Sequence, residues 1–266
     1  PFILAGALMK RLLLSLAMVL ALAAPSFAAE DIVVGVTPFP HKDIMLAAKP
    51  LLAKEGYNLV IKEFTDYVQP NMALASKQLF ANFFQHEPYL DNMNKEKKLD
   101  LVSIGKVHIE PLGVYSKKIK KLADLKKGNS ISVPNDPTNE ARALRLLEAN
   151  GVITIKPGAL VTVADITKNP LGLKFHELDA AQLPRTLDDV TASVINTNFA
   201  GEAGLVPARD ALVMEGSESP YANIVVVRNE DKDSPKAKAL MKAVQSPEVK
   251  AYIQKNLVER GIVPVF

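Results

Sequence analysis

The stretch NSISVPNDPTNEARALRLLEANG, residues 129–151, decides the fold class because it joins a strand to a helix through a polar turn. Its first part, NSISVPND, predicts a strand that runs into the turn. A helix is predicted over residues 139–151, with Thr138 or Asn139 capping its start and Gly151 just past its end. One face of this helix is apolar, at Ala141, Leu144 and Leu147. A strand followed by an amphipathic helix indicates an α/β protein.

The same alternation of short apolar runs and amphipathic segments extends outward through the chain. Strands are predicted over residues 31–37, 58–64, 99–105, 113–116, 173–179, 192–197 and 222–228. Helices are predicted over residues 42–56 and 182–190 and from Ser234 and Pro247 onward, and residues 72–84 predict a helix followed by a short strand. These elements are too many for one simple sheet. We therefore expect two α/β lobes, with chain crossings near residues 111–116 and 219–224 and a ligand cleft between the lobes.

The N-terminal segment has the pattern of a secretory signal peptide. From Met9 the chain reads MKRLLLSLAMVLALAAPSFA, with two basic residues, an apolar run and small residues before a predicted cleavage after Ala28. Residues 1–8 are interpreted as an upstream extension. An uncleaved membrane anchor is the weaker alternative, because the apolar run over residues 12–24 is short of the roughly 20 residues that a bilayer span needs.

The chain has no cysteine, which excludes disulfides, thiolate chemistry and cysteine-ligated metal. It also excludes a lipid attached to an N-terminal cysteine after signal cleavage. Together with the export signal, this predicts a soluble protein in a bacterial periplasm.

Composition indicates an ordinary globular protein, with 266 residues, 48% hydrophobic and 23% charged. Removing residues 1–28 takes away Lys10 and Arg11 and no acidic residue, so 30 basic and 29 acidic side chains remain. A nearly neutral chain gives no electrostatic argument for binding nucleic acid. The lysine-rich blocks 95–98 and 117–121 are interpreted as solvated helix faces.

No sequence motif for catalysis is present. G-x-S-x-G, H-E-x-x-H, a Walker A loop and G-x-G-x-x-G are all missing. The four histidines, at positions 41, 86, 108 and 176, lie far apart in the sequence. We therefore predict no enzyme activity, no cofactor and no metal.

Three segments are candidates for binding a small zwitterion. FTDYVQPN (64–71) carries Tyr67, NFFQHEPYLD (82–91) carries Phe84, His86 and Tyr89, and VPNDPTNEARAL (133–144) places Arg142 in the first turn of the predicted helix. A helix N-terminus favours an anion, and a guanidinium holds a carboxylate through two parallel hydrogen bonds. From the residues alone, the aromatic side chains could equally form a lobe core and Arg142 could be a surface arginine.

Seven ordered motifs resemble the methionine-binding lipoprotein family (MetQ/NlpA), the substrate-binding components of methionine ABC importers. They are DYVQPNMAL, FQHEPYLD, YSKKIKKLADL, VPNDPTNEARALRLLEANG, ELDAAQLPRTLDDV, VINTNFA and SPYANIVVVR, and the resemblance runs from about residue 32 to the C-terminus. It implies the two-lobed periplasmic-binding-protein fold, similar to type 2. One lobe would comprise residues 29–113 and 222–266, and the other residues 114–221.

The resemblance also implies roles for individual residues. Tyr67, Phe84, His86 and Tyr89 would line the pocket for the ligand side chain. Arg142 would hold the ligand carboxylate, and Asn196 and Asn223 would bind its polar backbone end. Phe83 and Gln85 are expected to pack within the lobe, and Asn71 and Asn198 to hold turns. His41, which follows the first strand, is a candidate to face the cleft without direct ligand contact.

The function predicted from this resemblance is capture of L-methionine by a soluble, monomeric periplasmic receptor, which delivers it to a permease with a separate ATPase subunit. The family's lipid-bearing cysteine is absent, so tethering to the membrane is not expected. Two alternatives stay open at this point. One is the same fold binding another apolar amino acid or a methionine-containing dipeptide, and the other is a surface antigen with a vestigial cleft.

Overall fold

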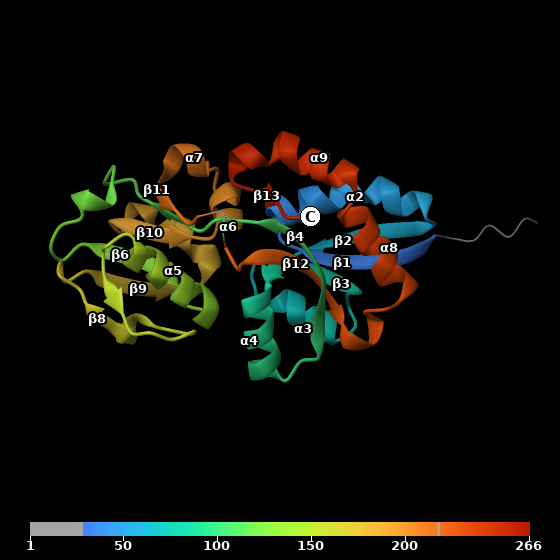
Figure 1. The fold of residues 1–266 in the computed structure, drawn as a ribbon, viewed down its shortest axis with the longest axis horizontal. Coiled ribbons are helices and arrows are strands. Elements are labelled where there is room, and N and C mark those ends of the chain that lie inside the picture. Colours follow the sequence, from blue (N-terminus) through green and yellow to red (C-terminus); the bar gives the residue numbers. More distant parts are fainter. Residues whose placement is uncertain (1–28, 217–218) are drawn as a thin grey trace, which may run out of the picture.

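The computed structural model describes residues 29–216 and 219–266, which form two lobes with one large sheet each (Figure 1). We call the part built on the six-stranded sheet the first lobe and the part built on the five-stranded sheet the second lobe. The predicted signal peptide, residues 1–28, lies outside the described residues. Within the described ranges, no helix is both long enough and apolar enough to cross a membrane.

The sheet of the first lobe has the strand order β13-β4-β12-β3-β1-β2. Its strands are β1 (Glu30–Val36), β2 (Tyr57–Glu63), β3 (Ala81–His86), β4 (Leu101–Ile109), β12 (Ala222–Arg228) and β13 (Val263–Pro264). Its helices are α2 (Asp43–Lys54), α3 (Gln69–Ala75), α4 (Glu87–Lys97), α8 (Pro235–Val244) and α9 (Pro247–Asn256). β1 is parallel to β2 and β3, whereas β12 is antiparallel to β3 and β4.

Both faces of this sheet are buried, which explains the nearly continuous apolar sequence of its central strands. Val34 of β1 packs in the core beneath α2, α8 and α9, and the neighbouring Val33 points to the opposite face, which α3 and α4 cover. In β12, Val225 and Val226 alternate between the same two cores. Figure 1 shows the two helical layers on opposite sides of the sheet.

The sheet of the second lobe has the order β11-β5-β10-β6-β9. Its strands are β5 (Gly113–Tyr115), β6 (Ser130–Pro134), β9 (Lys174–Leu178), β10 (Ala192–Ile195) and β11 (Ala211–Met214), and β7 (Thr154–Ile155) and β8 (Ile166–Lys168) form a separate hairpin-like pair. Its helices are α5 (Pro137–Ala149), the 3₁₀ helix η4 (Ala180–Asp188), α6 (Thr197–Glu202) and α7 (Pro207–Asp210). The apolar face of α5 packs on β6 and β10, and η4 and α6 pack on the other side of the sheet.

The chain crosses between the lobes twice, over residues 110–112 and between β11 and β12, where residues 215–216 and 219–221 are described. These two segments lie side by side: the Glu215 backbone N–H donates to the Leu112 carbonyl at 2.8 Å, and the Leu112 N–H donates to the Glu215 carboxylate at 3.0 Å. The crossings overlap the ranges expected from the sequence. The lobe boundaries themselves stay a prediction, and β5 begins at Gly113, one residue before the boundary that was proposed.

The start of α5 differs from the prediction in a way that matters for the site. Asp136 caps the helix, because its carboxylate accepts from the Asn139 backbone N–H at 2.9 Å, and Pro137 is the first helical residue. The helix therefore begins two residues before the predicted start. Arg142 consequently lies in the second turn rather than the first, so it belongs to the buried body of the helix.

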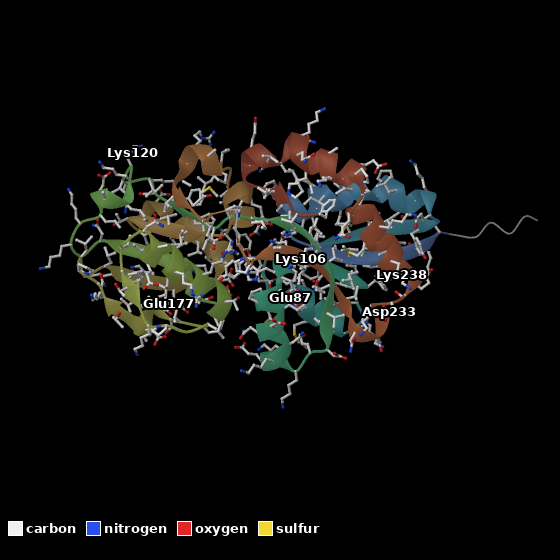
Figure 2. The ribbon with its side chains drawn as sticks, viewed as in Figure 1. Glu87, Lys106, Lys120, Glu177, Asp233 and Lys238 are labelled. Atoms are coloured by element: carbon white, nitrogen blue, oxygen red, sulfur yellow. The ribbon has the colours of Figure 1, made fainter. Side chains whose placement is uncertain are left out.

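Three other local predictions need correction. Residues 182–190 were expected to form an α-helix, but the segment is the 3₁₀ helix η4, which contains Pro184 and so loses one backbone donor. The lysine block 117–121 lies in the connection after β5 rather than on a helix, whereas block 95–98 does lie at the exposed end of α4. No helix was predicted over α4 as a whole. Pro88 occupies its first turn, where no backbone donor is needed. Charged side chains such as Lys120, Glu177 and Lys238 project from the surfaces of both lobes (Figure 2).

Candidate functional site

A cavity lies where the two lobes meet. All seven residues predicted from the sequence line it: Tyr67, Phe84, His86, Tyr89, Arg142, Asn196 and Asn223. Five further residues complete the lining, namely Gln85, Glu110, Asn139, Thr197 and Asn198. That the seven contact a ligand stays a prediction.

One wall of the cavity is aromatic and comes from the first lobe. Phe84 and Tyr89 pack against each other with ring centroids 6.0 Å apart, and Tyr67 lies 6.0 Å from Phe84. Phe84 precedes His86 in β3 with Gln85 pointing the opposite way, and Tyr89 follows in the first turn of α4. The strand-to-helix junction therefore brings the aromatic rings of NFFQHEPYLD to one place.

Gln85 borders the cavity but is held inside the first lobe. Its side-chain amide bonds to Asn71 at 2.7 and 2.9 Å and to Asn82 at 3.0 Å, in a buried polar group beneath the sheet edge. Phe83 is fully buried, edge-on to His41. The expectation that Gln85 and Phe83 pack within the lobe agrees with these contacts.

The aromatic wall also connects the two lobes. The Tyr67 hydroxyl donates to Asn198 Oδ1 at 2.6 Å, and the Tyr67 ring lies 4.9 Å from that of Phe199, both in the second lobe. Tyr89 supports this arrangement, because its hydroxyl donates to the Tyr67 carbonyl at 2.8 Å. The structure thus has the lobes in direct contact around the cavity.

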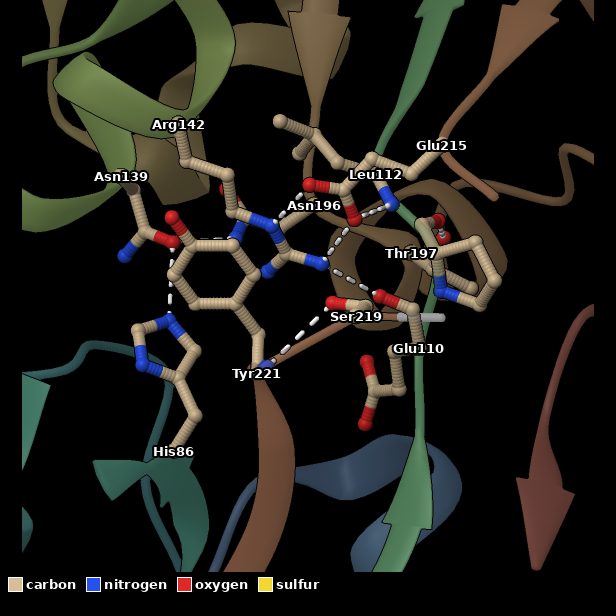
Figure 3. A network of polar contacts seen from close by, with 11 residues as sticks. His86, Glu110, Leu112, Asn139, Arg142, Asn196, Thr197, Glu215, Ser219 and Tyr221 are labelled. Carbon is tan, nitrogen blue, oxygen red and sulfur yellow. Dashed lines mark hydrogen bonds and ion pairs between the residues drawn. The ribbon is translucent and has the colours of Figure 1, made fainter. Parts of the chain in front are cut away.

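Arg142 reaches the cavity from α5 and is held by both crossing segments (Figure 3). Its Nε donates to Glu215 Oε1 at 2.8 Å, and Nη2 donates to Glu215 Oε2 at 2.5 Å and to the Glu110 carbonyl at 2.8 Å. The guanidinium also lies over the Tyr221 ring, with 4.2 Å from Cζ to the centroid. Within the described ranges, Nη1 has no hydrogen-bond acceptor. Arg142 is therefore a buried, fixed cation with one donor group still available.

Two asparagines in the second lobe carry unpaired polar atoms in the cavity lining. Asn196 Oδ1 and Asn198 Nδ2 are buried and have no hydrogen-bond partner in the described part of the chain. Buried polar atoms are nearly always satisfied, because leaving one unpaired costs about 1–3 kcal/mol. One unpaired acceptor and one unpaired donor in the same small cavity indicate a ligand with both kinds of group.

Asn223 and Glu110 form the polar floor on the first-lobe side. His41 Nε2 lies 3.0 Å from Asn223 Oδ1 and 3.2 Å from the Glu110 carboxylate, while its Nδ1 contacts the Thr37 hydroxyl at 2.6 Å. Two acceptors around Nε2 place the proton there. His41 thereby fixes the Asn223 amide, whose NH₂ group has no other partner among the described residues. His41 was a candidate to face the cleft, but it stands behind the lining rather than in it.

Burial controls the protonation of this floor. It lowers the pKa of His41 to about 4 and that of His108 to about 3, so both rings are neutral at pH 7. Burial raises the pKa of Glu110, and the nearby His41 and Arg142 oppose that rise. The pKa of His86 falls to about 3, first because the ring is buried and second because Arg142 is close.

One group in the described ranges has metal-ligand geometry: His41, His108 and Glu110, with ligand atoms within 4.8 Å of one another. His108 Nε2 lies 2.7 Å from Glu110 Oε1, the same oxygen that His41 approaches. Hydrogen bonds from two neutral imidazoles to one carboxylate account for this grouping. That the protein binds no metal stays a prediction.

Four lining residues were missed by sequence reasoning. Asn198 was expected to hold a turn, but its side chain accepts a hydrogen bond from the Tyr67 hydroxyl and lines the cavity. The prediction was wrong because Tyr67, its hydrogen-bond partner, comes from the other lobe. Glu110, Asn139 and Thr197 were not singled out. Glu110 lies where the chain leaves the first lobe, and Thr197 follows Asn196 at the start of α6. The sequence signals that could have indicated them as lining residues are the nearby predicted crossing for Glu110 and the motif VINTNFA for Thr197.

Comparison with known proteins places the chain in a family. Residues 32–266 match the NlpA lipoprotein family. The chain belongs to this family. It is 47% identical over 216 residues to the D-methionine-binding lipoprotein MetQ of Salmonella typhi, a match that covers 79% of each chain.

Solved structures of similar proteins share the fold. A nutrient binding protein from Burkholderia cenocepacia, bound to methionine, superimposes with a TM-score of 0.86 at 51% identity, covering 88% of this chain and 100% of that one. A periplasmic substrate-binding protein of an ABC transporter from Coxiella burnetii gives 0.84 at 47% identity, covering 88% and 100%. The predicted α/β, two-lobed periplasmic-binding-protein fold is confirmed.

Proposed function

We propose that the protein captures methionine in the cavity between its lobes and acts as the substrate-binding component of an ABC importer. One observation carries this proposal: the cavity between the lobes combines an aromatic wall with an unpaired acceptor and an unpaired donor. An amino acid with an apolar side chain needs this combination. The NlpA relatives support methionine, since one is named for binding D-methionine and another was solved with methionine bound.

The polar end of the ligand would meet complementary groups. Arg142 Nη1, Asn223 Nδ2 and Asn198 Nδ2 are donors suited to the ligand carboxylate. Asn196 Oδ1 and the Glu110 carboxylate are acceptors suited to its ammonium group. The ligand would satisfy Asn196 Oδ1 and Asn198 Nδ2, which are otherwise buried and unpaired among the described residues. Arg142, Asn223 and Glu110 belong to the lining of the same cavity.

The ligand side chain would lie against the aromatic wall of Tyr67, Phe84 and Tyr89. A thioether gains about 0.3–1.5 kcal/mol per contact with an aromatic ring, in addition to the burial of its methylene groups. This contact favours methionine over an aliphatic amino acid of similar size.

Capture would proceed by a shift in population toward the closed arrangement of the lobes. The donors and acceptors come from both lobes, so a ligand contacts all of them only when the lobes are closed. The closed form would then be recognised by a permease, and a separate subunit would hydrolyse ATP. In this role the protein is a monomeric periplasmic binding protein and catalyses no reaction.

Calorimetric titration tests this function. The protein is first unfolded, dialysed and refolded to remove any ligand that co-purifies, and is then titrated with L-methionine, D-methionine, leucine and Gly-Met. Binding of methionine with leucine at least tenfold weaker is expected. Tighter binding of leucine or Gly-Met would show the same fold serving another ligand, and no binding from correctly refolded protein would contradict the proposal.

A further inference from the structure

We infer that Asp136 and Asn139 are positioning residues that set the hydrogen-bond polarity of the cavity, so that it selects a ligand with a free ammonium group. This inference rests on the proposed function, because it concerns which end of an amino acid the site recognises. The sequence predicted no role for Asp136, and it predicted Asn139 only as a possible helix cap.

Asp136 fixes the orientation of the Asn139 amide. Its carboxylate accepts from the Asn139 backbone N–H at 2.9 Å and from the Thr138 hydroxyl at 3.0 Å. The Asn139 side-chain NH₂ donates to both carboxylate oxygens, at 3.1 and 3.0 Å. An ionised carboxylate only accepts hydrogen bonds, so the NH₂ group must face Asp136. Asn139 Oδ1 is thereby turned toward the cavity side.

Asn139 Oδ1 is the hydrogen-bond acceptor for one residue in each lobe. It lies 3.1 Å from His86 Nε2 in the first lobe and accepts from Asn196 Nδ2 at 3.1 Å in the second (Figure 3). An oxygen that only accepts requires the proton on His86 Nε2. The other ring nitrogen, Nδ1, agrees with this tautomer, since it accepts from the Tyr89 backbone N–H at 3.3 Å.

Asn196 Oδ1, the last polar atom in this series of hydrogen bonds, is the group that would contact the ligand. Asn196 uses its NH₂ group on Asn139, so its Oδ1 is left in the lining with no partner in the described residues. A buried acceptor with no donor rejects a ligand that brings a second acceptor. The 2-oxo acid analogue of methionine places a carbonyl oxygen where methionine has its ammonium group. A site built in this way should discriminate against it by on the order of 10⁴-fold.

The swap of the two side chains tests the inference. Asp136→Asn keeps the helix cap, since asparagine is also a good capping residue, but its NH₂ group can donate to Asn139 and permits the reversed amide. In the double variant Asp136→Asn with Asn139→Asp, the new amide donates to the new carboxylate. That carboxylate again accepts from His86 and Asn196. Asp179→Asn is the matched control, since Asp179 caps η4 through a 2.9 Å bond to the Ala181 N–H outside this network.

Two measurements are made on each variant. Titrations with L-methionine and with 4-methylthio-2-oxobutanoate give the ratio of the two dissociation constants. This ratio should fall at least about tenfold in Asp136→Asn, corresponding to one hydrogen bond, and return toward the wild-type value in the double variant. Nitrogen-15 NMR of the ligand-free protein should show His86 protonated on Nε2 in the wild type and as a mixture of tautomers in Asp136→Asn.

The outcomes separate this inference from the proposed function. An unchanged ratio and an unchanged His86 tautomer in folded Asp136→Asn would overturn the inference. So would a fall in the ratio that the double variant does not reverse. If the wild type binds no methionine, the proposed function fails, and the tautomer of His86 still decides whether Asp136 sets the polarity.

Discussion

Replacing Arg142 with alanine should weaken both the fold and ligand binding, and the structure allows the two effects to be separated. Arg142 is 4% exposed and forms a bidentate ion pair with Glu215, whose side chain is 15% exposed. Removal of the guanidinium leaves Glu215 without its cation and the Glu110 carbonyl without its donor. It also removes Nη1, one of the three donors proposed for the ligand carboxylate.

The stability cost follows from the broken ion pair. Removing one partner of a buried pair costs about 3–5 kcal/mol. We expect the lower end, about 3 kcal/mol, because Glu215 keeps the hydrogen bond from the Leu112 N–H and is not completely buried. Domains are typically stable by about 5–15 kcal/mol, so the variant should still fold. Adding Glu215→Gln removes the unpaired charge while keeping an acceptor for Leu112, and should recover about half of the loss.

The binding cost follows from one hydrogen bond between charged groups, about 1.5–3 kcal/mol. At 1.36 kcal/mol for each factor of ten, methionine affinity should fall by roughly 10- to 150-fold. Urea unfolding measures the stability of both variants, and calorimetry measures their affinities. The double variant should regain stability without regaining affinity. If its affinity returned to the wild-type value, the weakened binding in Arg142→Ala would be a consequence of instability, and the carboxylate would have another partner.

Two further predictions concern the contacts between the lobes and the buried histidines. Tyr67→Phe removes the hydroxyl that donates to Asn198 across the lobes, at a cost of about 0.5–1.5 kcal/mol, so methionine affinity should fall by roughly 2- to 12-fold. Calorimetry measures this change in affinity. Tyr57→Phe, at a half-buried ring without such a bond, is the control and should leave the affinity unchanged. The pKa of His86 is lowered to about 3 in the folded state, so between pH 3 and 6.5 the unfolded chain binds more protons and the unfolding free energy should fall as pH decreases. In urea titrations at several pH values, His86→Gln should make this pH dependence shallower by up to about 1.4 kcal/mol per pH unit. His176→Gln, at an exposed position, should leave the dependence unchanged. Equal slopes in the wild type and both variants would contradict the shifted pKa of His86.

The fold could be predicted where local signals and burial agree. The β-branched run of β12 begins and ends at the residues predicted, because both faces of that strand are buried and its sequence leaves no other interpretation. The two C-terminal helices begin at Pro235 and Pro247, within one residue of the predicted starts, because Ser234 and Ser246 cap them before a proline. In contrast, no helix was predicted over α4 as a whole, and a proline such as Pro88 is compatible with both a turn and a first helical turn.

The site could be predicted to the extent that its residues lie in recognisable motifs. All seven predicted residues line one cavity, although they come from five separate segments of the chain. Asn139 and Asn198 were not predicted to be in the site because their roles depend on partners in the other lobe, His86 and Tyr67. A single sequence records which side chains are present, whereas the direction of an amide is decided by neighbours that only the closed fold brings together.

Arg142 joins ligand recognition to the movement of the lobes. Its Nε and Nη2 groups bind Glu215 and the Glu110 carbonyl, which lie on the two crossing segments, and only Nη1 is left for the proposed carboxylate. Any change in the angle between the lobes involves the two crossing segments, so it changes the geometry around this one guanidinium. A bound carboxylate would therefore stabilise the particular crossing geometry that presents Nη1 to the cavity. This arrangement requires Arg142 to be buried and paired with Glu215, because a mobile surface arginine would bind the same carboxylate with the lobes open or closed and would not favour either state.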